Sequence, residues 1–197
     1  MHMAKKGLRA LGIAESFRGR ERSTLAGVVM RRDGVVDGFG FGEVAVGGMD
    51  GTDAAVSLFL GLGREDINCI LLSGCVIAWY NIIDPDAVNR ATGLPVVVVT
   101  YEDSEGLEED IAAHFPGDAE RMAAYRRLGP RVPLPLGTGY TVYLRAAGIE
   151  AAEARRVVDA FTRDGKIPEP LRVARLAARA AMQYRYRQRR ERLSSRP

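Results

Sequence analysis

The sequence predicts one α/β domain built on a mixed β-sheet, and two observations carry this prediction. Apolar runs rich in Val, Ile and Leu, separated by Gly, Asp or Asn, indicate strands at residues 8–14, 24–31, 35–41, 67–73 and 94–100. The first three runs are joined by short turns, whereas helical patterns separate the later ones. Adjacent strands followed by strand–helix alternation are typical of a mixed sheet flanked by helices.

Helical patterns account for much of the remaining chain. Thr52 or Asp53 can cap a helix that continues to about Leu62, and Pro85 can open another helix after Asp84. The other expected elements are one or two helices in 105–128, broken at the FPGD sequence, a short strand at 140–146, and helices at 149–163 and 169–192.

The length of 197 residues fits one domain, which we expect at residues 1–183, followed by a basic and flexible tail at 184–197. A hydrophobic content of 47% is too high for a disordered chain. The longest apolar run, at 94–99, is strand-sized and too short to span a membrane. Because the first residues also lack a signal-peptide core, we expect a cytoplasmic protein.

Charge is distributed unevenly along the chain. Residues 171–197 contain nine arginines and one glutamate, a formal charge of +8, whereas the whole chain carries +3 and residues 1–170 therefore carry −5. On the last expected helix, Arg172, Arg175 and Arg179 share one face, and small apolar residues share another. This pattern predicts a helix that packs on one side and presents cations, which bind anions, on the other.

Glu15 follows directly after the first apolar run. A carboxylate at the end of a buried strand costs several kcal/mol unless it is paired, hydrogen-bonded or bound to a metal. Arg18, Arg20 or Arg22, in the adjacent loop, could pair with it. The alternative is a functional carboxylate, because perturbed acids gather at active sites.

The strand at 67–73 ends in two small residues, Ser73 and Cys75, which either pack or take part in chemistry. Cys69 and Cys75 form neither a CxxC pair nor a disulfide framework, so we expect both to be reduced. His114 belongs to a distant expected helix, so no Cys–His pair supports a thiol nucleophile.

Aromatic and glycine-rich segments offer candidate nucleic-acid contacts. Trp79, Tyr80 and Asn81 come just after the strand-end turn, where they can stack on a base and hydrogen-bond to it, although Trp79 fits a core position equally well. The glycine-rich residues 38–48 lack the G-x-G-x-x-G spacing of a dinucleotide-binding fold. We expect them to form a loop that approaches a nucleic-acid backbone.

Several motifs together resemble a known family. The segments GIAESF, GFGFGEVAVGGMDGTDA, LSGCVIAWYNIID and GKIPEPLRVARL are similar to the archaeal endonuclease dU family, over roughly Leu8 to Ala180. More distantly, residues 71–81 and 143–180 resemble endonuclease V, in which a strand, a helix and a PEP-x-R-x-A segment follow in that order.

The resemblance implies an RNase H-like, endonuclease V-like fold and cleavage of DNA that contains deoxyuridine or another deaminated base, as in DNA repair. It also implies Mg²⁺ or Mn²⁺, because clustered carboxylates hold the hard cations that activate water at a phosphodiester. Glu15 falls where endonuclease V carries its first metal-binding aspartate. The second acid corresponds to Asp53 or Asp50, and the apolar pattern after them favours Asp53.

The chain departs from the endonuclease V pattern at the other site positions. Ser73 stands at the third aspartate, Cys75 at a histidine, Arg175 at the last acidic or histidine position, and Tyr101 near a lysine. Two interpretations follow from the resemblance. Either one metal is held by Glu15, Asp50 and Asp53 with help from Glu102, or the mechanism differs from that of endonuclease V.

The sequence thus favours a metal-dependent DNA endonuclease in which Arg172, Arg175 and Arg179 contact phosphates, and it leaves the oligomeric state open. The first alternative is a non-catalytic nucleic-acid-binding protein with the same fold. The second is an enzyme that acts on a small nucleoside or phosphorylated substrate in the same pocket.

Overall fold

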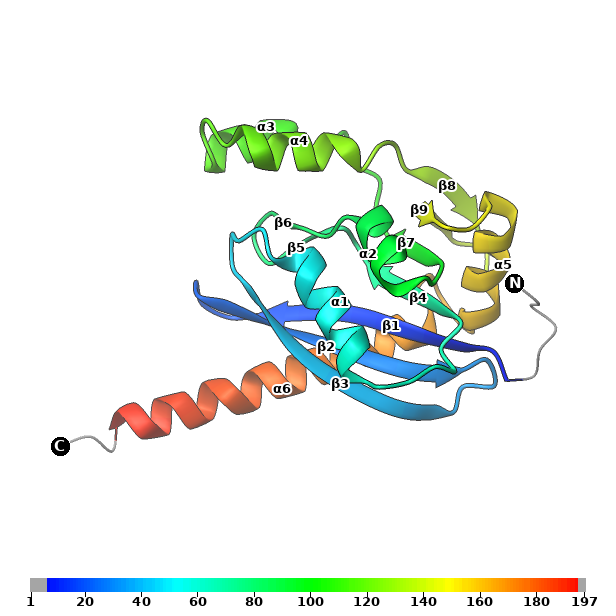
Figure 1. The fold of residues 1–197 in the computed structure, drawn as a ribbon, viewed down its shortest axis with the longest axis horizontal. Helices are drawn as coiled ribbons and strands as arrows, with labels where there is room; N and C mark the ends of the chain where they lie inside the picture. Colours follow the sequence, from blue (N-terminus) through cyan, green and yellow to red (C-terminus); the bar gives the residue numbers. More distant parts are fainter. Residues whose placement is uncertain (1–6, 195–197) are drawn as a thin grey trace.

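The computed structural model describes residues 7–194, and a central sheet with helices on both faces makes up most of them (Figure 1). Residues 1–6 and 195–197, which belong to the expected domain and tail, lie outside the described part. The expected domain boundary at 183 falls inside one continuous helix that extends to Ser194. The division into a domain and a flexible tail therefore stays a prediction.

The main sheet has seven strands in the order β3-β2-β1-β4-β7-β9-β8. Its members are β1 (Arg9–Phe17), β2 (Arg22–Arg31), β3 (Val36–Ala45), β4 (Cys69–Ser73), β7 (Val96–Thr100), β8 (Val132–Pro135) and β9 (Thr141–Ala147). Strands β1, β4 and β7 run parallel to one another, and the other neighbouring pairs are antiparallel. The mixed sheet predicted from the apolar runs is confirmed.

The helices are α1 (Gly51–Gly61), α2 (Pro85–Thr92), α3 (Glu108–His114), α4 (Ala119–Arg127), α5 (Ala151–Phe161) and α6 (Glu169–Ser194). As expected, Pro85 opens α2, and Asp84 caps this helix, because its carboxylate accepts from the backbone N–H groups of Asp86 and Ala87. Helix α1 begins earlier than predicted, at Gly51, so neither Thr52 nor Asp53 caps it. Asp50 occupies the capping position but makes no capping bond there.

Side chains that alternate along β1 divide the core into two layers. Leu11 and Ile13 pack in a cluster with Leu58 of α1, whereas Ala10, and Leu8 just before β1, pack in a second cluster with residues of α5 and α6. This alternation is the period of two expected for a strand covered on both faces. None of the described helices combines the length and apolar character needed to span a membrane.

Helix α6 approaches β1 closely at Gly12. A Cβ atom at this position would lie 2.5 Å from the backbone carbonyl carbon of Pro170, at the start of α6. From this contact the helix runs outward past the sheet (Figure 1). Leu171, Ala174 and Ala178 are buried, so the first half of α6 packs through small apolar residues as the sequence predicts.

Three short or irregular strands were not expected. Strand β8 contains two prolines and pairs only with β9 at the sheet edge, where proline is tolerated. Strands β5 (Val76–Ile77) and β6 (Asn81–Ile82) form a separate two-stranded sheet. The prediction of a glycine-rich loop at 38–48 is wrong over most of its length, because β3 continues to Ala45 and pairs with β2.

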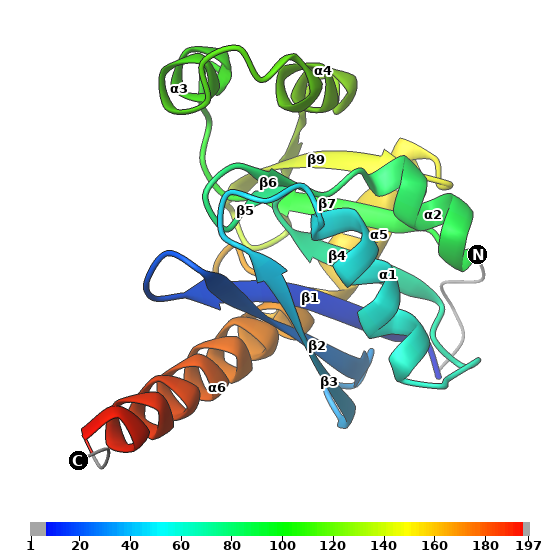
Figure 2. The same ribbon diagram turned by 60° about the vertical axis from the view of Figure 1, so that its left-hand side comes forward.

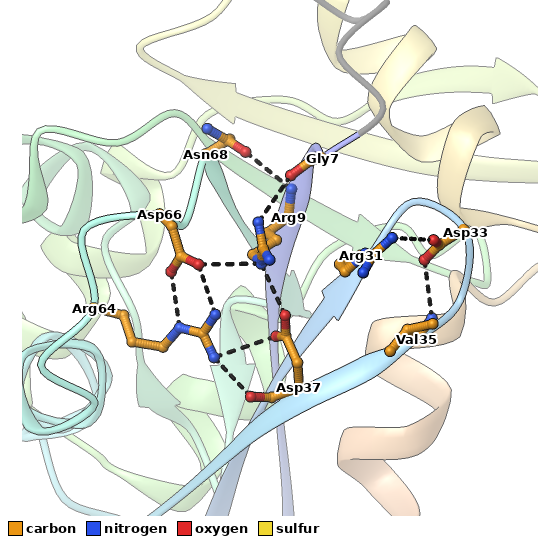
Figure 3. A network of polar contacts seen from close by, with 9 residues as sticks. All are labelled: Gly7, Arg9, Arg31, Asp33, Val35, Asp37, Arg64, Asp66 and Asn68. Carbon is orange, nitrogen blue, oxygen red and sulfur yellow. Dashed lines mark hydrogen bonds and ion pairs between the residues drawn. The ribbon is translucent and has the colours of Figure 1, made fainter.

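An ion-pair network fixes the end of the sheet at which β1 begins (Figure 3). Arg9 of β1 contacts Asp37 of β3 and Asp66 of the α1–β4 connection, at 2.8 and 3.1 Å. Arg64 grips Asp66 through two hydrogen bonds of 2.8 and 2.7 Å and also lies 3.2 Å from Asp37. These contacts join three segments at the opposite end of β1 from Glu15.

Candidate active site

The parallel central strands β1, β4 and β7 all have their carboxyl ends at the same end of the sheet, and a pocket of about 320 Å³ opens there. Glu15 enters it from β1, Ser73 from the end of β4, Tyr101 from just after β7 and Arg175 from α6. Sites at the carboxyl ends of parallel strands are common in α/β folds, because the loops that follow diverge and leave a crevice.

Glu15 has neutral hydrogen-bond partners in this pocket. Its Oε2 atom accepts from the Ser23 hydroxyl, and its Oε1 atom accepts from the backbone N–H of Ala78 at 3.3 Å. Among residues 7–189, whose side chains the structure describes, no arginine forms an ion pair with Glu15, so pairing with Arg18, Arg20 or Arg22 is not what satisfies it. A carboxylate has about four acceptor positions, so Glu15 retains capacity for a water or a ligand.

Tyr101 and Ser73 face each other, with 3.4 Å between the two hydroxyl oxygens. Burial raises the pKa of Tyr101, and the contact with Ser73 and the positive charge of Arg175 offset part of that rise. The Arg175 guanidinium carbon lies 5.8 Å from the Tyr101 ring centroid. The phenol therefore stays protonated at neutral pH, beside a cation.

Asp50 lies outside this pocket and is already engaged. Its two oxygens accept from the backbone N–H of Ala45, both at 3.1 Å, and its Oδ1 accepts from the Asn81 amide at 2.6 Å. Arg22 lies 3.6 Å from its Oδ2. Asp50 therefore ties the end of β3 to the start of α1.

Asn81 is completely buried, which corrects its prediction as a base contact. Its amide nitrogen donates to Ala45 and Asp50, and its amide oxygen accepts from the backbone N–H of Gly51 at 2.8 Å. These bonds leave the side chain no access to a ligand. Asn81 holds the start of α1 and the β5–β6 segment together.

The remaining predicted acids are not gathered with Glu15. Asp53 is exposed on α1, and Glu102 points to solvent, where it pairs with Lys166. Within the described part of the chain, no group of three or more His, Cys, Asp or Glu side chains is arranged to hold a metal ion. The four-ligand arrangement of Glu15, Asp50, Asp53 and Glu102 therefore does not fit this structure.

Cys75 is buried, and burial raises the pKa of its thiol to about 12. Cys69 is buried in the same way, with its pKa also raised to about 12. A thiol with such a pKa holds almost no thiolate at neutral pH, and the thiolate is the nucleophilic form. Both cysteines are free, and Cys75 acts as a small apolar residue.

The turn beside Glu15 has an unusual backbone. Ala78, Trp79 and Tyr80 have φ angles of 39°, 62° and 61°, in the left-handed region that residues other than glycine rarely adopt. Glu15 accepts from Ala78, and the Ala78 carbonyl in turn accepts from the backbone N–H of Gly47 at 2.8 Å. Strain of this kind persists only where surrounding contacts hold it, and it clusters at functional sites.

Aromatic rings gather on this turn. The ring of Trp79, whose side chain is 47% exposed, lies 4.7 Å from the His114 ring and 5.5 Å from the Tyr80 ring, measured between centroids. Tyr80 also contacts His114 and Phe115, at 5.5 and 5.9 Å. His114, which the sequence places in a distant helix, thus joins Trp79 through folding of the 105–128 segment.

Arg121 of α4 stabilises the turn at residues 78–80 through hydrogen bonds. Its side chain is buried and donates to the backbone carbonyls of Gly48 at 2.9 Å, Tyr80 at 2.6 Å and Gly47 at 2.9 Å. Its guanidinium also lies 3.9 Å from the centroid of the Phe115 ring. The sequence contains no local signal for this role, because the partners are more than forty positions away in the chain.

The three predicted arginines of α6 have different surroundings. Arg175 lines the Glu15 pocket, whereas Arg172 pairs with Glu169 within α6, which raises the pKa of Arg172. Arg179 is exposed. The cationic face expected from the spacing therefore begins at the pocket and continues outward along the helix.

The chain matches the family profile described as "Endonuclease dU" over residues 6–182. The chain belongs to the endonuclease dU family. Archaeal relatives include a UPF0215 protein of Pyrobaculum calidifontis, 42% identical over 176 residues that cover 88% of this chain and 97% of that protein. A UPF0215 protein of Thermococcus kodakarensis is 35% identical over 164 residues, covering 82% and 83% of the two chains.

Solved structures show what the fold of this endonuclease dU family member is similar to. A protein of unknown function from Archaeoglobus fulgidus superposes with a TM-score of 0.78 at 31% identity, covering 89% of this chain and 98% of that one. Human endonuclease V gives a TM-score of 0.66 at 16% identity, covering 94% and 89%. The RNase H-like, endonuclease V-like fold implied by the motifs is confirmed.

A third structure is endonuclease V of Ciona intestinalis in complex with a 24mer DNA that contains an inosine followed by a ribo-adenosine. It gives a TM-score of 0.62 at 13% identity and covers 92% of this chain and 88% of that one. The fold shared with this chain is therefore one that accommodates nucleic acid in another protein.

Proposed function

We propose that this protein is an endonuclease that cleaves DNA containing deoxyuridine or another deaminated base, with the Glu15 pocket as its cleavage site. The observation that carries the proposal is the position of Glu15, which shares the pocket at the carboxyl ends of the central strands with Tyr101 and Arg175. Membership of the endonuclease dU family and the endonuclease V-like fold support a nuclease.

Each pocket residue has a role suited to phosphodiester hydrolysis. Glu15, with free acceptor capacity, orients a water and takes its proton as the water oxygen attacks phosphorus. Arg175 offsets negative charge that develops on the phosphate oxygens. Tyr101, kept protonated by burial, donates a hydrogen bond to the same phosphate or to the oxygen that leaves.

Mg²⁺ or Mn²⁺ stays part of the proposal, but with fewer protein ligands than the four carboxylates that the sequence suggested. Glu15 is the one carboxylate lining the pocket among the described residues, so the protein alone does not complete the coordination of a metal. Mg²⁺ in proteins commonly keeps several waters and binds one or two carboxylates plus substrate phosphates. Glu15 is the residue that would hold such an ion.

Base recognition is assigned to Trp79 and Tyr80 at the strained turn. Trp79 presents a partly exposed ring next to the segment whose Ala78 N–H touches Glu15, so a stacked base and the cleaved phosphate would lie close together. Aromatic side chains stack on unpaired bases of any sequence. Arg175 and Arg179, and Arg172 when released from Glu169, would contact phosphates.

The test uses labelled duplexes with one uracil, one hypoxanthine or no lesion, each with Mg²⁺, Mn²⁺ or EDTA. We expect nicking near the lesion in at least one metal arm. Glu15→Gln should lower the nicking rate by on the order of 10²–10⁴-fold, the usual contribution of a general base, with an unchanged melting temperature. Glu150→Gln, at an exposed position before α5, is the matched control and should nick normally.

A destabilised Glu15→Gln protein with normal activity per folded molecule would overturn the assignment. One observation favours a second candidate, a non-catalytic nucleic-acid-binding protein, because the described residues lack a cluster of metal ligands. That alternative predicts duplex binding by the wild type without nicking in any metal arm.

A further inference from the structure

A second, larger cavity lies away from the Glu15 pocket and is lined mainly by arginines. It has a volume of about 630 Å³ and lies between the tip of the β1–β2 hairpin and the outer half of α6. Arg18, Arg20 and Arg22 approach it from the hairpin, and Arg185 and Arg189 approach it from the helix. We call these five residues and the space between them the arginine groove.

The outer half of α6 is not held against the hairpin by an apolar face. Met182, Arg185, Tyr186 and Arg189 all line the groove, and their spacing of i, i+3, i+4 and i+7 places them on one side of the helix. In a helix that packs on a core, these positions would be apolar. Here two of the four are arginines, so this side faces a polar space.

The cations of the groove outnumber the carboxylates that reach them. Arg189 pairs with Glu21 at 2.9 Å, while Arg185 and Arg22 share Glu43. Among the residues that the structure describes, no carboxylate lies within ion-pair distance of Arg18 or Arg20. The groove therefore has a positive excess on a protein whose first 170 residues carry a net charge of −5.

The contacts that the arginines do make are readily exchanged. Arg18 stacks over the Tyr186 ring, with its guanidinium carbon 4.4 Å from the centroid, which orients a cation without neutralising it. Arg189 and Glu21 are both exposed, and Arg185 is exposed whereas its partner Glu43 is half-buried. Ion pairs that are open to solvent contribute little to stability. A phosphate group can replace these carboxylates at small cost.

We propose that the arginine groove binds the sugar–phosphate backbone of the nucleic acid beside the cleavage site, an inference that rests on the proposed nuclease function. Arg18 follows Glu15 by three positions, or roughly 10 Å of extended chain. Arg185 follows Arg175 by ten helical positions, or roughly 15 Å. At about 3.4 Å per nucleotide along a duplex, the groove meets the strand about three to four nucleotides from the cleaved phosphate.

The experiment compares three variants by their Kd for a 30-base-pair uracil duplex at several salt concentrations. In the groove variant R18Q/R20Q/R185Q/R189Q, log Kd should depend less steeply on log salt, by roughly 0.9 for each phosphate that the variant no longer binds and about 2–4 in total. Removing groove carboxylates in E21Q/E43Q should tighten binding. The control R155Q/R156Q removes two exposed arginines of α5 and should leave the slope unchanged.

A purely structural role gives a different pattern. If these arginines only attach α6 to the hairpin, the groove variant and E21Q/E43Q should both melt earlier, and neither should change the salt slope. Opposite effects of the two variants on affinity, with all melting temperatures similar, therefore identify binding.

Shortened substrates locate the contact. Duplexes that end two base pairs from the uracil on one side or on the other should differ, because only one of them still reaches the groove. On the duplex that no longer reaches it, wild type and groove variant should bind equally.

If log Kd depends equally steeply on log salt for both proteins on every substrate, and the wild type still nicks, the groove proposal alone is overturned. A wild type that binds no duplex would overturn the groove and the proposed function together.

Discussion

Glu15 shows how a single residue can be located by sequence while its surroundings cannot. The apolar run before it indicates a strand end, and the structure places it there, in a pocket. Its partners, however, are Ser23 from the paired strand and Ala78 from a turn sixty-three positions away. The arginines that follow in sequence line the groove instead, because Arg18 and Arg20 lie in the turn between β1 and β2 and Arg22 begins β2.

Trp79 permits a test of base stacking at the residue scale. Trp79→Ala should weaken binding of a uracil-containing oligonucleotide by about 1–3 kcal/mol, the usual contribution of one stacked base, or roughly 5- to 150-fold in Kd. The fold should remain, because the ring is 47% exposed. Trp79→Phe should retain much of the affinity.

The matched control for Trp79 is Phe39→Ala, which removes another exposed aromatic ring, on β3, with 51% exposure. Affinity and melting should both stay near wild type in this control. A Trp79→Ala protein that binds normally but melts much earlier would show that the ring serves packing alone.

At the scale of elements, local patterns predicted the strands and helices that carry strong periodicity or capping, such as α2 with its Asp84 cap. They failed where contacts between separate segments, and not the local pattern of residues, decide the outcome. A strand was expected at 35–41, but the glycines at 38–48 suggested a loop, and hairpin pairing with β2 keeps the chain extended to Ala45. Likewise, the sequence predicted helices where α3 and α4 lie, but it did not predict that His114 and Arg121 contact the turn that contains Trp79.

The contact between β1 and α6 predicts a stability effect at Gly12. Gly12→Ala would place a methyl group 2.5 Å from the carbonyl carbon and 2.6 Å from the oxygen of Pro170, which are backbone atoms that cannot rotate away. Overpacking of this kind typically costs about 1–3 kcal/mol. For a chain of this size we expect the melting temperature to fall by roughly 2–4 °C per kcal/mol.

Gly61→Ala provides the control for this substitution. Gly61 ends α1, and nothing lies within 4 Å of the position that its Cβ would occupy. Alanine also has the higher helix propensity, so this variant should melt at or slightly above the wild-type temperature. Similar melting of the two variants would show that α6 does not press on β1 at Gly12.

For the whole molecule, the order of apolar and helical segments predicted an α/β fold and the residue counts predicted a charge asymmetry, to which the structure gives a location. The segment with a charge of +8 starts at residue 171, near the start of α6. It includes the pocket-lining Arg175 and continues along the part of α6 that extends beyond the sheet (Figure 2). The metal site was not predictable in the same way. The motif resemblance placed three acids near one another, but the fold commits Asp50 to Ala45 and Asn81 and leaves Asp53 exposed.

Two aspartates predict how stability of the whole fold depends on pH. Hydrogen bonding from Arg64 lowers the pKa of Asp66, and the backbone N–H of Arg121, followed by its side chain, lowers the pKa of Asp118. A carboxyl group whose pKa is lower in the folded state stabilises the fold at pH values above its unfolded pKa, near 3.8. That contribution is lost as the pH falls through the folded pKa, when both groups become protonated.

The measurement is the melting temperature of the wild type and of an Asp66→Asn/Asp118→Asn variant between pH 2 and pH 7. The variant should melt earlier than the wild type near neutral pH, where only the wild type has the two carboxylates. Below about pH 4 the difference should shrink, because protonation removes the same charges from the wild type. High salt should reduce the difference at neutral pH, since both carboxylates are partly exposed and screened. A difference that stays constant down to pH 2 would show that the two carboxylates stabilise the fold through something other than their charge.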